Sequence, residues 1–203
     1  VITADLATAG GAEQLYKETK QRNLSVDILV NNAGRGNAGE FSDQDVEHMR
    51  GTMELNMLSM SILSRLFLDN MRQNKQGHIL NIASVAGFMP GPGFAVYHAS
   101  KAFVLSLSEA LNTELAGTGV SVTVSCPGPT ESEFHQHAET LDLKTFKLLT
   151  LMPAEQVAKE AYTAMKAGKS LVIHGLINQA LATSPKLLPR RFVPAIVKKM
   201  MAK

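Results

Sequence analysis

A tyrosine and a lysine four residues apart could form an acid–base pair. Tyr97 and Lys101 fall in a stretch whose pattern predicts a helix over about residues 97–116, and residues four apart share one helix face. The phenol and the ammonium can then point at the same place, where the cation favours phenolate and lowers the tyrosine pKa from about 10. A tyrosine tuned in this way can act as general acid or base on a carbonyl or alcohol oxygen.

Two further polar residues precede this pair. Ser84 lies thirteen residues before Tyr97, at the predicted end of a strand, where its hydroxyl could hydrogen-bond the same substrate oxygen. Asn56 falls inside a helix predicted over about residues 43–73, a place that disfavours asparagine unless its side chain or a distorted backbone does something local. Taken singly, each of these residues has an ordinary structural interpretation, as a surface helix residue, a strand-end cap or a tolerated polar residue.

Short apolar runs alternate with helical stretches along the chain. The runs are typical of strands in a parallel sheet covered on both faces, and they span residues 1–3, 26–30, 78–83, 120–125 and 170–173. Helices are predicted over about 10–22, 43–73, 97–116 and 154–167. This alternation predicts βαβ units in an open, doubly wound parallel α/β sheet, whose ligands bind outside the carboxyl ends of the strands.

Small, polar or turn-forming residues follow four of these strands. They are Asp5 and Leu6, Asn-Asn-Ala-Gly at 31–34, Ser84 with a Gly/Pro-rich stretch at 87–93, and Cys-Pro-Gly-Pro-Thr at 126–130. Such residues end strands and expose backbone groups. We therefore expect the ligand site at this edge of the sheet.

Composition limits the class of protein. The chain has 203 residues, of which 45% are apolar and 19% charged, with a formal net charge of +2; these values fit one globular domain and argue against disorder. Its single cysteine, Cys126, has no disulfide partner in the chain, fits a reducing cytosol and is expected to be a buried thiol. No apolar run approaches the roughly 20 residues of a membrane span.

Five sequence elements, in this order and spacing, resemble the short-chain dehydrogenase/reductase family: Asn-Asn-Ala-Gly at 31–34, Asn56, Ser84, Tyr97-x-x-x-Lys101 and Pro127-Gly128. The resemblance implies a Rossmann-like fold and an oxidoreductase that transfers hydride between a nicotinamide cofactor and a carbonyl or secondary alcohol. It also implies four catalytic residues. Tyr97 would be the acid/base, Ser84 would polarise the substrate oxygen, Lys101 would lower the Tyr97 pKa and bind the nicotinamide ribose, and Asn56 would anchor a proton-relaying water.

The same resemblance implies the cofactor contacts. Positions 5 and 6 match contacts with the adenine, 31–34 stabilise the sheet and line the cofactor, and 127–130 lie beside the nicotinamide. The expected cofactor-binding residues are Asp5, Leu6, Asn31, Ala33, Gly34, Tyr97, Lys101, Pro127, Gly128 and Thr130. The cofactor is expected to be NADP or NAD, with NADP favoured, and no metal is expected.

The resemblance begins at the third strand of the family's sheet. The family's first βαβ unit, whose Gly-rich turn binds the pyrophosphate, lies ahead of that point. We therefore expect the chain to be one partial domain over 1–203 that lacks this unit, with a bare apolar strand edge at 26–30. The alternative is a non-catalytic cofactor-binding or interaction protein that kept the fold. Sugar epimerases and dehydratases share Tyr-x-x-x-Lys but usually lack the Asn-Asn-Ala-Gly turn.

The C-terminal part carries further features. Residues 131–152 match a substrate lid, in which His135 and His137 more simply face solvent or substrate than bind a metal. Residues 161–203 hold eight basic and no acidic residues. The segment 175–203 is expected to form basic, apolar helices that close the substrate pocket, or, through 186–203, to lie on an anionic membrane surface. Charge alone does not support a nucleic-acid partner.

A methionine stripe and the apolar loops complete the predictions. Met49, Met53, Met57 and Met60 are spaced for one helix face, which indicates core packing, with part of the stripe facing a partner subunit. In the resembled family this helix often contributes to the oligomer interface, so a homo-oligomer is expected. The loop at 88–94, the lid and the apolar C-terminus suggest an apolar or acyl-like small-molecule substrate.

Overall fold

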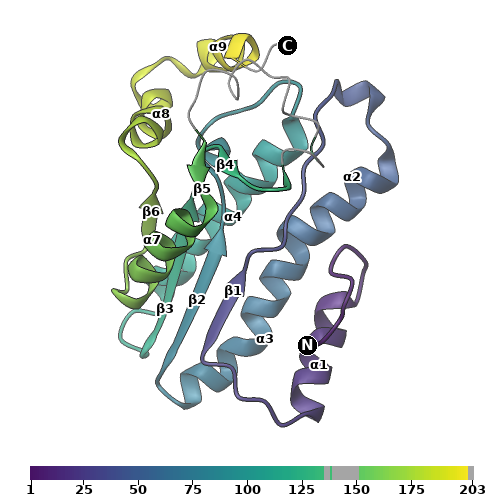
Figure 1. Ribbon diagram of the computed structural model, residues 1–203, viewed down its shortest axis with the longest axis vertical. Helices are drawn as coiled ribbons and strands as arrows, with labels where there is room; N and C mark the ends of the chain where they lie inside the picture. Colours follow the sequence, from purple (N-terminus) through teal and green to yellow (C-terminus); the bar gives the residue numbers. More distant parts are fainter. Residues whose placement is uncertain (135–137, 139–150, 201–203) are drawn as a thin grey trace.

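A four-stranded parallel sheet forms the centre of the molecule. The computed structural model describes residues 1–134, 138 and 151–200. The strands of this sheet are β1 (Ile28–Asn31), β2 (Gly77–Ile82), β3 (Val120–Cys126) and β6 (Leu171–Ile173). Their order is β1-β2-β3-β6, and each neighbouring pair is parallel (Figure 1). The predicted parallel α/β class is therefore confirmed.

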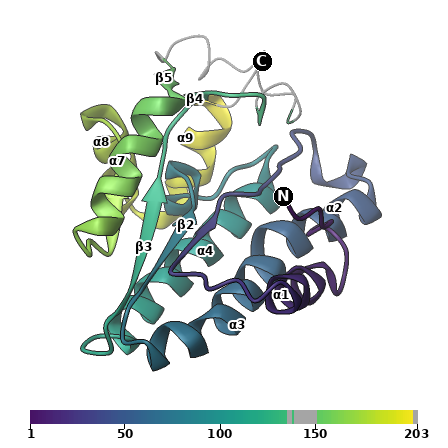
Figure 2. The ribbon, with the colours of Figure 1, turned by 60° about the horizontal axis from the view of Figure 1, so that its bottom comes forward.

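Helices cover both faces of this sheet. They are α1 (Gly11–Gln21), α3 (Met60–Gln73) and α4 (Ala95–Glu114) on one side and α7 (Ala154–Lys166) on the other (Figure 2). In β2, Ile79 packs into a cluster with Phe67 of α3, whereas the next residue, Leu80, packs against Met165 of α7. Successive side chains of a strand point to opposite faces, so a strand that is apolar throughout needs cover on both sides.

One edge of the described sheet is open. β1 pairs only with β2, and its side chains Ile28 and Val30 are 36% and 47% exposed. Within the described residues nothing covers these two side chains fully, as expected for the strand predicted at 26–30.

The strand predicted at residues 1–3 is wrong. These residues form no strand and pair with none of the described strands. An extended segment becomes a strand only when a neighbour completes its backbone hydrogen bonds. Here the carbonyl oxygen of Val1 accepts a hydrogen bond from Nη1 of Arg22 instead, at 3.4 Å.

The helix predicted over 43–73 is interrupted in its middle. α2 (Val46–Met53) begins at Asp45, whose carboxylate accepts a hydrogen bond from the backbone N–H of His48 at 2.7 Å. A π-helical segment, Glu54–Ser59, then joins α2 to α3 and contains Asn56. Such π-helical turns are rare and often occur at functional sites.

The C-terminal segment lies over the carboxyl ends of the strands. It consists of α8 (Leu176–Leu187), a short 3-10 helix (Arg190–Phe192) and α9 (Val193–Met200), near the top of Figure 1. Val193 and Val197 of α9 are buried. Two short strands, β4 (Thr130–Glu131) and β5 (Met152–Pro153), pair in parallel between the 127–130 turn and α7. Most of the predicted lid, including His135 and His137, lies outside the described residues.

Candidate active site

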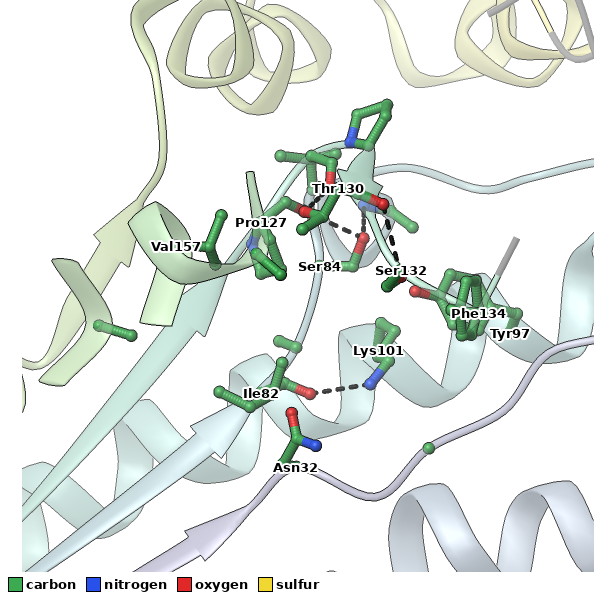
Figure 3. Close-up of a pocket in the computed structure, with 18 of the residues that line it drawn as sticks. Asn32, Ile82, Ser84, Tyr97, Lys101, Pro127, Thr130, Ser132, Phe134 and Val157 are labelled. Atoms are coloured by element: carbon green, nitrogen blue, oxygen red, sulfur yellow. Dashed lines mark hydrogen bonds between the residues drawn. The ribbon is translucent and has the colours of Figure 1, made fainter. Parts of the chain in front are cut away.

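A pocket of about 720 Å³ opens at the carboxyl ends of β1, β2 and β3 (Figure 3). This is the sheet edge at which the sequence predicted a ligand site. Of the predicted site residues, those lining the pocket are Ala33, Gly34, Ser84, Tyr97, Lys101, Pro127, Gly128 and Thr130. The structure thus brings together residues from four separate parts of the chain.

Lys101 lies at the polar end of this pocket and is only 6% exposed. Its Nζ donates a hydrogen bond to the carbonyl oxygen of Ile82 at 2.8 Å, at the end of β2 (Figure 3). Burial lowers the pKa of Lys101 to about 8, with the Cys126 thiol acting in the opposite direction. Desolvation disfavours the charged form of an amine, and a neutral carbonyl compensates this less than a carboxylate would.

Tyr97 lies one helical turn before Lys101, on the same side of α4. Its ring stacks on Phe94 with 4.5 Å between centroids and lies 5.2 Å from the ring of Phe134. The ammonium nitrogen of Lys101 is 5.7 Å from the centroid of the Tyr97 ring. The predicted i, i+4 juxtaposition is therefore present.

The pKa of Tyr97 departs from the prediction in direction. Burial raises it to about 12, although a hydrogen bond with Ser84 acts to lower it. The sequence predicted a lowered pKa because of the neighbouring cation. In this structure desolvation is the largest effect on Tyr97, and the hydrogen bond of Lys101 goes to Ile82. A phenol in this state keeps its proton at neutral pH.

Ser84 lies two residues after the last residue of β2 and caps a short 3-10 helix, Val85–Phe88. Its Oγ accepts a hydrogen bond from the backbone N–H of Ala86 at 3.1 Å and donates one to the carbonyl oxygen of Pro127 at 3.4 Å. The second bond is long, so it can be exchanged for a bond to a substrate oxygen at small cost. Ser84 thereby connects the end of β2 with the turn after β3.

Asn56 is buried behind the pocket wall and does not line the pocket. Its Oδ1 accepts a hydrogen bond from the backbone N–H of Arg35 at 3.0 Å. Its Nδ2 donates to the carbonyl oxygen of Arg35 at 2.8 Å and to Oγ of Ser100 at 3.0 Å. These bonds tie the π-helical segment to Arg35, which directly follows Asn-Asn-Ala-Gly, and to Ser100 of α4, which directly precedes Lys101.

Asn31, Asp5 and Leu6 also lie away from the pocket lining. Nδ2 of Asn31 donates to Oγ of Ser64 at 3.0 Å and to Oδ1 of Asn81 at 2.8 Å, which joins β1 to α3 and β2. The Asp5 carboxylate accepts a hydrogen bond from the backbone N–H of Ala7 at 2.9 Å. Leu6 packs against the α1–α3 core. In the described part of the chain, the contacts of these three side chains are with neighbouring protein groups that they help to hold in place.

Much of the pocket's lining consists of residues that the sequence motifs did not indicate. Asn32 lines it next to the predicted Ala33, although it belongs to the same turn. The remaining residues are largely apolar and include Phe94, Phe134, Val157, Tyr162, Leu181 and Val197. Phe94 directly precedes α4 and Phe134 follows β4, in the loop and the lid that the sequence had indicated as apolar, whereas the other four come from α7, α8 and α9.

The described part of the chain holds no cluster of metal-binding side chains, and its thiol is buried. No group of three His, Cys, Asp or Glu residues among the described residues could hold a metal ion. Cys126 is fully buried, and burial raises its pKa to about 12. A thiol in this state is not a nucleophile at neutral pH, as predicted for a buried strand-end residue.

Comparison with known proteins relates the whole chain to reductases. It is 35% identical over 181 residues to the ketoacyl reductase HetN of Nostoc sp., covering 88% of this chain and 60% of that protein. It is 30% identical over 198 residues to dehydrogenase/reductase SDR family member 7B of Rattus norvegicus, covering 95% of this chain and 61% of that protein. The chain thus spans about three fifths of the length of these curated relatives.

A solved structure and a family match agree with these relatives. The short-chain dehydrogenase from Sphingobium yanoikuyae in complex with NADPH superimposes with a TM-score of 0.78 at 29% identity, covering 90% of this chain and 70% of that one. The short chain dehydrogenase family matches residues 1–142, which hold Asn56, Ser84, Tyr97 and Lys101. The chain therefore belongs to the short chain dehydrogenase family.

Proposed function

We propose that the protein carrying this chain is an NAD(P)-dependent oxidoreductase that acts on a carbonyl or secondary alcohol. The observation that carries the proposal is the grouping of Tyr97, Lys101 and Ser84 in a largely apolar pocket. The NADPH in the Sphingobium yanoikuyae structure supports a nicotinamide cofactor, and we favour NADP over NAD.

The residues at the strand ends fit such a cofactor. A Cβ on Gly34 would lie 3.3 Å from Oδ1 of Asn56 and 3.4 Å from Nζ of Lys101, so a larger side chain would crowd the ammonium. An ammonium can donate several hydrogen bonds, so Lys101 can bind a ribose hydroxyl while it holds Ile82. Besides these two residues, we propose Tyr97, Ala33, Pro127, Gly128 and Thr130 as direct contacts, with Asn31 supporting β1 and with Asp5 and Leu6 toward the adenine.

In this proposal the cofactor supplies or accepts the hydride, and the chain handles the proton. The Tyr97 hydroxyl donates a proton to the substrate oxygen during reduction and accepts one during oxidation. Ser84 donates a hydrogen bond to the same oxygen, and the Lys101 ammonium stabilises the phenolate that reduction leaves behind. Asn56 holds the backbone at Arg35 and anchors the water that relays protons to Lys101.

Replacement of the Tyr97 hydroxyl tests this assignment. In the protein that carries this chain, Tyr97→Phe should lower kcat by at least about 100-fold, the usual contribution of a positioned acid/base group, while NADPH fluorescence titration shows nearly unchanged binding. Retained turnover would refute the role of Tyr97. If the unmutated protein binds NADPH but reduces no carbonyl, the alternative of a non-catalytic cofactor-binding protein is correct.

The lining of the pocket favours an apolar substrate. Apolar side chains from the helices over the strand ends face a single polar cluster, and a site of this kind binds an apolar body with one carbonyl at the polar end. We therefore propose a small-molecule carbonyl or alcohol with an apolar or acyl-like body. The last helix contributes Val197 to this lining, which agrees with a C-terminal segment that closes the pocket.

The outer face of the same C-terminal segment is both basic and apolar. Leu187, Leu188, Phe192 and Ile196 are 80%, 41%, 48% and 42% exposed. Exposed basic residues lie close to them along the chain: Lys186, Arg190, Arg191, Lys198 and Lys199. No helix among the described residues is long and apolar enough to cross a membrane. We propose peripheral contact between this face, which we call the C-terminal basic face, and an anionic membrane.

We also propose that the protein forms a homo-oligomer. Met60 of the methionine stripe is buried in the core, so that residue packs internally as predicted. Leu58 and Phe103, on the packed π-helical segment and α4, are 49% and 40% exposed and offer an apolar surface to a second copy. Light scattering after size-exclusion chromatography should give a mass that Phe103→Glu lowers; a monomeric unmutated protein would contradict this proposal.

A further inference from the structure

A fully buried histidine links three elements behind the pocket wall. Nε2 of His174, directly after β6, lies 2.8 Å from Oγ of Ser125 in β3. Its Nδ1 lies 2.7 Å from Oε2 of Glu160 in α7, whose other carboxylate oxygen accepts a hydrogen bond from Gln156 at 2.8 Å. The Glu160 side chain is 40% exposed. A continuous hydrogen-bond chain therefore runs from the surface to the interior of the sheet.

The backbone of the same histidine holds a fourth element. The carbonyl oxygen of His174 accepts a hydrogen bond from Nδ2 of Asn178 in α8 at 2.7 Å. The Asn178 amide lies flat against Gly128, and a Cβ on Gly128 would overlap it. The Asn178 amide thus packs directly against Gly128 of the pocket-lining turn at 127–130.

The order serine, histidine, carboxylate is that of acyl-transfer triads, but the burial of Ser125 excludes this chemistry here. Ser125 and His174 are both 0% exposed, and neither lines the pocket. A nucleophile must reach its substrate, so the network has another role.

Backbone hydrogen bonds connect this network to the segment that carries Ser84. The carbonyl oxygen of Ser125 accepts a hydrogen bond from the backbone N–H of Ala83 at 2.8 Å. Two residues later, the carbonyl oxygen of Pro127 accepts from the N–H of Val85 at 2.9 Å and from Oγ of Ser84 at 3.4 Å. Pro127 of the 127–130 turn therefore contacts the backbone directly after Ser84 and, more weakly, the Ser84 hydroxyl itself.

We propose that His174 is a positioning residue for the oxidoreductase reaction. Oriented by Glu160, it holds Ser125 and Asn178, and these two hold the 127–130 turn so that Ser84 faces the substrate oxygen. The proposal rests on the proposed function above. A catalytic hydroxyl displaced by a fraction of an ångström loses much of its effect, which gives a remote residue influence over kcat.

The network can be tested by substitution of Glu160, which is partly exposed, so that no fully buried side chain has to be removed. In the protein that carries this chain, Glu160→Ala removes the acceptor for Nδ1 and should lower kcat on the order of tenfold, because a misplaced catalytic group costs rate. Glu160→Gln keeps an acceptor oxygen and should restore most of that loss. Glu155→Ala removes a carboxylate from the same helix outside the network and should leave kcat unchanged.

A double-mutant cycle separates positioning from general destabilisation. If Glu160 acts through Ser84, Glu160→Ala should cost little further kcat in a Ser84→Ala background. An equal fold-loss in both backgrounds, or no loss in the single variant, overturns the proposal. If Glu160→Ala melts below the assay temperature, Ser125→Ala takes its place in the cycle. If the unmutated protein lacks NAD(P)H-linked turnover, the proposed function itself fails, whereas normal turnover unaffected by these variants defeats only the role of His174.

Discussion

Lys101 donates its hydrogen bond to the carbonyl oxygen of Ile82 at 2.8 Å, which pairs a buried ammonium with a neutral acceptor. None of the ion pairs found among the described residues includes Lys101. Burial of the charge therefore costs free energy, and the pKa of Lys101 falls to about 8.

This cost should appear as a pH-dependent difference in unfolding free energy between the native protein and the variant Lys101→Met. Below pH 8 the lysine is charged in both folded and unfolded states, and the folded state carries the full desolvation cost. Between pH 8 and about 10.5 only the unfolded state holds the proton, so the cost is relieved as pH rises. The unfolding free energy of the native protein relative to Lys101→Met should therefore rise by about 3 kcal/mol across this window, from about 1.36 kcal/mol per pKa unit.

Urea denaturation at a series of pH values measures this difference. Lys17→Met, which removes an exposed lysine of α1, is the matched control and should show no such trend. A constant difference between native protein and Lys101→Met from pH 7.5 to 10.5 would show that the Lys101 ammonium is not desolvated.

The hydrogen bonds of Asn56 should stabilise the folded protein. Asn56→Leu keeps the branched side-chain shape but leaves both the N–H and the carbonyl oxygen of Arg35 without their side-chain partner. Unsatisfied buried polar groups cost about 1–3 kcal/mol each, so the unfolding free energy should drop by roughly 2–6 kcal/mol. Asn74→Leu, at an exposed position after α3, is the control. Thermal unfolding that leaves both variants equally stable would contradict this account.

The placement of several pocket residues could be predicted from local spacing. The i, i+4 relation of Tyr97 and Lys101 depends only on helix geometry, and the rule that ligands bind at strand ends located Ser84 and the 127–130 turn at one edge. The sequence could not show that Lys101 would bond to Ile82, nineteen residues away. Because that bond and the burial decide the electrostatics, the direction of the Tyr97 pKa was predicted wrongly.

The secondary-structure predictions that were wrong also failed because of contacts between residues far apart in the sequence. Residues 1–3 have a strand-like composition, but composition cannot supply the neighbour that a strand requires. The long helix was predicted in one piece because its π-helical interruption depends on hydrogen bonds between Asn56 and Arg35, twenty-one residues apart. The link from Ser125 to His174 spans forty-nine residues, and no local pattern indicates it.

The apolar wall should set the preference for substrate length. Leu181→Asn places an amide in the pocket lining, whereas Leu187→Asn alters an 80% exposed residue of the same helix. Burial of a leucine side chain is worth about 1.5–3 kcal/mol, so kcat/KM for a long-chain ketone should fall roughly 10- to 100-fold in Leu181→Asn. A short ketone that does not reach α8 should be reduced at the native rate by both variants. An equal loss for short and long ketones would rule out a direct contact at Leu181.

The C-terminal basic face should bind anionic bilayers through charge and exposed apolar side chains together. The protein should float with vesicles of phosphatidylserine and phosphatidylcholine but not with phosphatidylcholine alone, because each Lys or Arg near an anionic surface contributes about 1 kcal/mol. Arg190→Glu/Arg191→Glu should abolish flotation, since it reverses two charges beside Phe192. Lys17→Glu/Lys75→Glu reverses the same number of exposed charges elsewhere and should still float. Equal flotation of the two double variants would mean that this face does not contact the membrane.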